Sequence, residues 1–139
     1  MSPFRLLEHT ADIGLQVEST DLASLFHEAG RGLQEIIGGQ TPQTGQETAR
    51  AIELRATDRA DLLVLWLQEW LFLFDTYGLV IVRDEIETLT ETDLRATLYC
   101  TPVEQSGFGA EREVKAVTYH RLKLASTPRG WLAEVYFDL

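Results

Sequence analysis

One stretch of the chain limits the fold more than any other. Between residues 62 and 74 nearly every side chain is apolar, and at helical spacing these side chains occupy almost every face. A helix that is apolar all round must be buried on more than one side. We therefore expect a central core helix. The alternative is a helix whose outer face, with Trp66 and Trp70, binds a protein partner. At 13 residues the stretch is shorter than the about 20 that a bilayer core requires, so no membrane span is expected.

The rest of the chain predicts the elements around this helix. Apolar positions from Asp21 to Gly38 follow helical spacing, and His27 in this first helix is expected to be solvated. The apolar helix starts at Asp58 and ends at Gly78, because glycine readily adopts the left-handed conformation of a helix end. Strand patterns cover residues 4–8, 13–18, 49–56, 79–87, 94–101, 114–125 and 131–139. The order ββαβαββββ predicts an α+β fold of two layers, with two helices packed on an antiparallel or mixed sheet.

Length and charge narrow the classes of function. At 139 residues the chain fits one domain, placed at 1–139. The formal charge of −10 repels a phosphate backbone, so RNA is expected only as an indirect partner. The same acidic excess suits a metal cation or a basic protein patch, and a solubilising surface explains it equally well. The lone Cys100 and an N-terminus without a secretory pattern make a cytoplasmic location the expectation.

The last two strands predict a C-terminal hairpin. Its turn centres near Pro128, in a segment typical of turns. Antiparallel pairing then sets Asp138 opposite Thr118, within about two residues. Lys115 comes to the same end of the hairpin as Asp138. The two charged side chains are therefore expected to share a site.

Carboxylates near this hairpin form a candidate cation site. Asp138 lies beside the α-carboxylate of Leu139, and carboxylate oxygens are ligands for hard cations such as Ca²⁺ and Mg²⁺. Asp12, in the polar link between the first two strands, could supply a third ligand. Equally, Asp12 could stabilise a turn while Asp138 forms a solvated end. His9 and His120 are expected around the ligands rather than among them.

Several segments, in the same order along the chain, resemble the archease family. They are HTADIG at 9–14, LLVLWLQEWL at 62–71, VKAVTYH at 114–120 and FDL at 137–139. The chain departs from the family pattern at two places. Gln68 stands where asparagine is common, and TPVE at 101–104 replaces a more usual Gly-Glu opening of a loop. The resemblance spans nearly the whole chain.

The resemblance implies a function and the residues that carry it. Asp12 and Asp138 correspond to metal-binding carboxylates, the main chain at Leu139 contributes, and Lys115 is required for function. The expected ion is Ca²⁺, with Mg²⁺ and Mn²⁺ as alternatives. Archeases act with a GTP-dependent tRNA-splicing RNA ligase and promote its guanylylation and multiple turnover, so the resemblance implies an accessory factor that is not itself an enzyme. Two other functions stay open: a metal-dependent phosphoester hydrolase and a chaperone-like protein-binding module.

Overall fold

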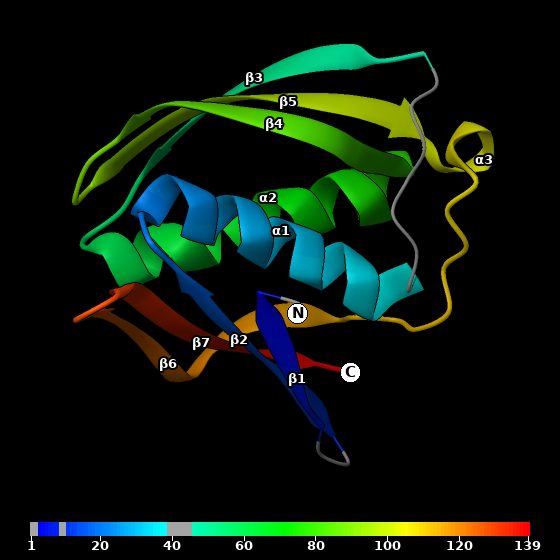
Figure 1. The fold of residues 1–139 in the computed structure, drawn as a ribbon. Coiled ribbons are helices and arrows are strands. Elements are labelled where there is room, and N and C mark those ends of the chain that lie inside the picture. Colours follow the sequence, from blue (N-terminus) through cyan, green and yellow to red (C-terminus); the bar gives the residue numbers. More distant parts are fainter. Residues whose placement is uncertain (1–2, 9–10, 39–45) are drawn as a thin grey trace.

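The structure is a computed structural model that describes residues 3–8, 11–38 and 46–139 (Figure 1). Its elements, in chain order, are β1 (Phe4–Glu8), β2 (Asp12–Ser19), α1 (Leu22–Gly38), β3 (Thr48–Arg55), α2 (Arg59–Tyr77), β4 (Leu79–Leu89), β5 (Asp93–Pro102), α3 (Val103–Ser106), β6 (Ala116–Thr127) and β7 (Gly130–Asp138). The bounds of all predicted helices and strands agree within two residues. The short helix α3 is an addition to the predicted order, and it includes part of the unusual segment 101–104.

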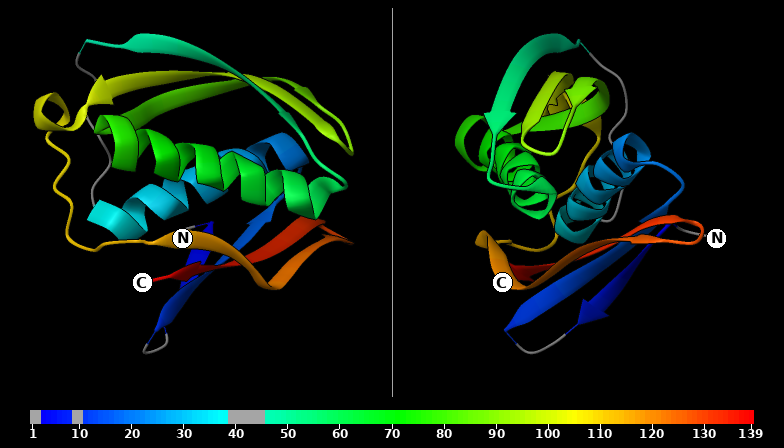
Figure 2. Two further views of the ribbon diagram at one scale, coloured as in Figure 1. Left: turned by 180° about the vertical axis from the view of Figure 1, so that it is seen from behind. Right: turned by 90° about the vertical axis from the view of Figure 1, so that its left-hand side faces the viewer.

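The strands form two antiparallel sheets rather than the single sheet expected. Sheet A has the strand order β1-β2-β7-β6, and sheet B has the order β3-β5-β4. Figures 1 and 2 show both long helices lying between the two sheets, so the molecule has three layers. The α+β class is confirmed. The layer arrangement differs because period-two alternation identifies strands but not the sheet that each strand joins.

Helix α2 is the central core helix that its apolar pattern predicts. It contacts β3 and β4 of sheet B as well as β6 of sheet A. Trp66 is fully buried and Trp70 is only 4% exposed. The indole N–H of Trp66 donates to the carbonyl of Phe26 in α1 at 2.8 Å. The alternative in which both tryptophans form a partner-binding surface is therefore wrong.

The ends of α2 also follow from the sequence. The side chain of Asp58 accepts a hydrogen bond from the backbone N–H of Asp61 at 2.8 Å, which caps the first turn. Gly78 ends the helix with a φ of 62°, in the left-handed region that only glycine enters without a steric penalty. The backbone N–H of Gly78 donates to the carbonyls of Leu73 and Phe74 in the last turn of the helix. These two caps fix where α2 begins and ends.

Two polar contacts tie α1 to β4. The side-chain amide of Gln34 is buried, donating to the carbonyl of Ile81 at 3.0 Å and accepting from the Ile81 N–H at 2.8 Å. His27 is half-buried and its Nδ1 contacts a carboxylate oxygen of Asp84 at 2.5 Å. The expectation that His27 is simply solvated is wrong, because Asp84 on β4 comes close only through packing of the helix on sheet B. The hydrogen bond to Asp84 raises the pKa of His27, and burial opposes it.

Candidate functional site

The register of sheet A places Asp12 directly opposite Asp138. In the antiparallel pairing of β2 with β7, the Cα atoms of these two residues are partners, and Ile13 pairs with Phe137 in the next row. Ile13 and Phe137 are fully buried against the helices. Since successive side chains of a strand alternate between faces, Asp12 and Asp138 lie on the outer face of the sheet. Opposed residues of an antiparallel pair are close neighbours, so the register brings Asp12 and Asp138 together at one end of sheet A.

Lys115 lies beside this pair through the main chain. Its N–H donates to the carbonyl of Asp138 at 2.8 Å, and Ala116 is the Cα partner of Asp138. The prediction that Asp138 lies within two residues of Thr118 in the hairpin is thus confirmed. The proximity of Lys115 and Asp138 is confirmed as well. On the other side of β7, the N–H of Leu139 donates to the carbonyl of Ala11 at 3.2 Å, which fastens the last residue next to β2.

The donor set of this site is acidic and oxygen-rich. Asp12 is half-buried, whereas Asp138 and Lys115 are exposed. Across residues 3–8, 11–38 and 46–139, no three His, Cys, Asp or Glu side chains are grouped as metal ligands. His9 lies outside the described residues. The arrangement therefore offers two opposed carboxylates, with the position of Leu139 next to them.

Tyr136 connects the acidic pair to His120. It occupies the same outer face two residues before Asp138, and a Cβ at Gly14 would lie 2.8 Å from its ring. Its hydroxyl donates to Glu134 at 2.9 Å, and the ring of His120 meets its edge with centroids 6.0 Å apart. The hydrogen bond to Glu134 raises the pKa of Tyr136, with contributions from burial and from nearby carboxylates. Sequence reasoning missed Tyr136, although its period-two spacing from Asp138 was the available signal.

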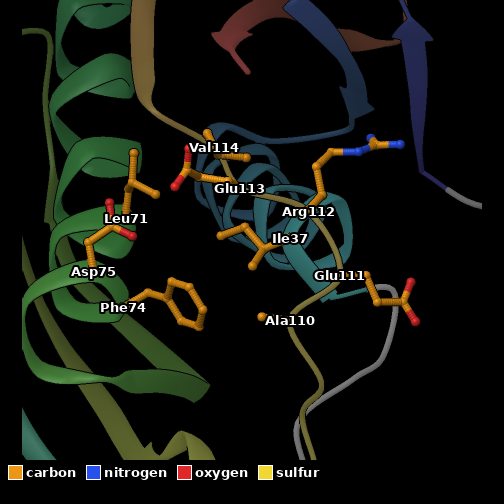
Figure 3. A pocket seen from close by; sticks show the side chains of 9 residues that line it. All are labelled: Ile37, Leu71, Phe74, Asp75, Ala110, Glu111, Arg112, Glu113 and Val114. Atoms are coloured by element: carbon orange, nitrogen blue, oxygen red, sulfur yellow. The ribbon is translucent and has the colours of Figure 1, made fainter.

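A cavity of about 380 Å³ opens next to the segment that leads into Lys115 (Figure 3). Its apolar floor includes Phe74 of α2 and Ile37 of α1, whose carbonyl accepts the N–H groups of Glu111 and Arg112. Figure 3 shows the carboxylates of Asp75 and Glu113 on one side of the cavity, with Glu111 and Arg112 extending away from them. Burial and the charge of Glu113 raise the pKa of Asp75. The cavity therefore brings the carboxylates of Asp75 and Glu113 together beside the segment that leads into Lys115.

The fold and the site define a class: an acidic α+β protein in which two antiparallel sheets enclose two helices and present a carboxylate pair at one end of a sheet. Residues 4–139 match the archease protein family. The protein archease of Methanosarcina acetivorans is 33% identical over 140 residues, covering 98% of this chain and 95% of the relative. That of Thermococcus gammatolerans is 33% identical over 136 residues, covering 95% of each.

A solved structure leads to the same family. The solution structure of protein 1598 of Methanobacterium thermoautotrophicum matches with a TM-score of 0.74 and 28% identity, over 100% of both chains. The chain belongs to the archease family. Membership supports an accessory role. In the part of the chain that the structure describes, no helix is both long and apolar enough to cross a membrane.

Proposed function

We propose that this protein activates a GTP-dependent tRNA-splicing RNA ligase in the cytoplasm, promoting guanylylation of the ligase and multiple turnover. The observation that carries the proposal is the register that opposes Asp12 and Asp138, with Lys115 hydrogen-bonded beside them. The ligase is the protein partner, and RNA is engaged only through it. The nucleotide chemistry belongs to the ligase, and the accessory protein contributes charge and position.

The site residues fit a divalent cation. Like charges placed directly opposite each other on a sheet repel, and a bound cation removes that penalty. Carboxylate oxygens suit Ca²⁺, the ion we propose, and also Mg²⁺ or Mn²⁺. Asp12 and Asp138 would hold the ion, and a main-chain oxygen of Leu139 stays a predicted ligand. When bound, the ion supplies charge neutralisation for phosphate oxygens.

The chain's own residues then have distinct tasks. Asp12 and Asp138 lie on the outer face of the sheet, where a partner can approach them. Lys115 is exposed and adds a positive charge at the same end of the hairpin. The acidic excess elsewhere in the protein favours encounter with a basic RNA-binding cleft, because charge complementarity speeds association and orients it.

Multiple-turnover RNA ligation by the cognate ligase tests the proposal, measured with and without this protein across Ca²⁺, Mg²⁺ and Mn²⁺. Asp12→Asn, Asp138→Asn and Lys115→Met are expected to lower stimulation at least about tenfold, in the range seen when groups that hold a metal are disturbed. Glu18→Gln on β2 and Lys123→Met on β6 are matched controls that change exposed charges elsewhere on sheet A, and they should retain stimulation. No stimulation by the unmodified protein under any of the metals would refute the activator role.

Unfolding with and without the ion provides a second, ligase-independent readout. Without metal, Asp138→Asn should stabilise the protein by about 0.2–1 kcal/mol, because it removes the repulsion between opposed carboxylates. With the ion at about 100 times its Kd, the unmodified protein should gain about 2.7 kcal/mol and the variant much less. Turnover of a phosphate ester by the isolated protein, lost in Asp12→Asn, would instead support the hydrolase function.

A further inference from the structure

Strand β6 contains a long bulge where it pairs with β7, the strand that carries Asp138. Thr118 pairs with Tyr136, but the next paired residues are Lys123 and Glu134, so the residues between Thr118 and Lys123 face a single residue of β7. Within this bulge Arg121 has a φ of 54°, and it is the one residue other than glycine with positive φ in the described part of the chain. Such conformations are sparsely populated and persist when surrounding contacts hold them.

Contacts on both sides hold the bulge. The hydroxyl of Tyr119 donates to Asp61 in the first turn of α2 at 2.6 Å. On the outer face, the guanidinium of Arg121 lies 5.8 Å from the ring centroid of Tyr136, and the His120 ring packs against the edge of the same ring. Both distances are those of favourable cation–π and aromatic contacts. The bulge therefore presents His120 and Arg121 next to the row of Asp12 and Asp138.

Charge is distributed unevenly between this sheet and the rest of the molecule. Sheet A with its flanking Lys115 and Arg129 carries five basic and five acidic residues, whereas the remainder carries seven basic and seventeen acidic. The whole net charge of −10 thus lies outside sheet A. In sheet B, Arg55, Arg83 and Arg95 form ion pairs with carboxylates, for example Arg95 with Glu53 at 2.7 Å. Among the described residues, Arg121 forms no such ion pair.

We propose that Arg121 and His120, held over Tyr136, bind a phosphate group of a nucleotide beside the Asp12–Asp138 carboxylate pair. Guanidinium and imidazole N–H groups are strong donors to phosphate oxygens. A single nucleotide fits better than an RNA strand, because a polyanion longer than this face would meet the acidic remainder of the protein. The choice of a guanine nucleotide rests on the proposed function. A cation on Asp12 and Asp138 strengthens the binding by cancelling their repulsion of the phosphate.

The test is an NMR titration of the full chain with GMP, with and without Ca²⁺. GMP with Ca²⁺ should shift the signals of His120, Arg121 and Tyr136, and without Ca²⁺ the affinity should be lower. Arg121→Asn should weaken the affinity by about 10-fold to 100-fold, the range for losing a charged hydrogen bond. Asparagine tolerates positive φ, so this variant removes the cation while keeping the bulge and the stability. Arg129→Gln, in the β6–β7 turn, is the matched control and should bind GMP normally.

Several results would overturn the inference. These are the absence of GMP binding with Ca²⁺, an Arg121→Asn variant that binds normally, and tighter binding of a short RNA than of GMP. Ligation assays distinguish failure of the phosphate site from failure of the proposed activator function. If Arg121→Asn binds GMP normally and stimulates the ligase fully, the phosphate site is wrong while the activator role stands. If the unmodified protein binds GMP through Arg121 yet never stimulates the ligase, the activator role is wrong while the phosphate site stands.

Discussion

Replacing His27 with alanine leaves Asp84 as a carboxylate without its partner between α1 and sheet B. A buried polar group that loses its partner destabilises a protein by about 1–3 kcal/mol. The side chain of Asp84 is 3% exposed and that of His27 is 39% exposed, so water reaches the vacated position and the upper end of this range is excluded. Alanine is also a better helix former than histidine by about 0.5 kcal/mol. Subtracting that gain from a loss of about 1–2 kcal/mol gives an expected net loss of unfolding free energy of about 0.5–1.5 kcal/mol.

The loss of unfolding free energy in His27→Ala should be larger at low pH than at high pH. The pKa of His27 in the folded protein is raised from its ordinary value of 6.5, chiefly by the hydrogen bond to Asp84, against the opposing effect of burial. In the unfolded chain it returns to that ordinary value. The stabilisation by the charged histidine is thus complete below pH 6.5 and is lost as the pH rises through the higher folded-state pKa. The difference in unfolding free energy between the unmodified protein and His27→Ala should therefore narrow as the pH rises above 6.5.

Urea unfolding followed by tryptophan fluorescence at a series of pH values measures both effects. His120→Ala is the control for removal of an imidazole, since His120 is exposed and has no carboxylate partner among the described residues. The double variant His27→Ala/Asp84→Leu should recover part of the loss, because the unpaired acid is then gone. The reasoning is refuted if His27→Ala loses less than about 0.5 kcal/mol below pH 6.5, the range of an ordinary surface change. A gap that stays constant with pH would equally refute it.

Two further variants test the packing and capping of the helices by the same unfolding assay. Gly30→Ala should destabilise the protein by about 1–2 kcal/mol, because its Cβ would lie 2.4 Å from the buried Trp70 ring and the overpacking exceeds the gain in helix propensity; an increase in stability would contradict this. Asp58→Ala should destabilise by about 0.5–2 kcal/mol through loss of the cap of α2, whereas Asp58→Ser, which can still cap, should lose much less.

Much of the site could be predicted from local pattern. The turn at Pro128 and the rules of antiparallel pairing were enough to place Lys115 and Asp138 at one end of a hairpin, and the structure agrees. The opposition of Asp12 and Asp138 required the pairing of β2 with β7, which no local signal specifies. The bulge in β6 could not be predicted from the sequence either, because the contact of Tyr119 with Asp61 joins a strand to a distant helix.

The sequence by itself determined the class of elements, their bounds and the central position of α2, because periodicity and capping are local properties of neighbouring residues. It also identified the archease family through motifs whose order along the chain is as informative as their composition. Only the tertiary structure decided that the strands divide into two sheets around the helices, that His27 meets Asp84, and that Arg121 stands over Tyr136. These features depend on which distant segments pack together. Local preferences do not distinguish between the alternative strand pairings. The pairing that forms is the one that lets several elements bury a common apolar core.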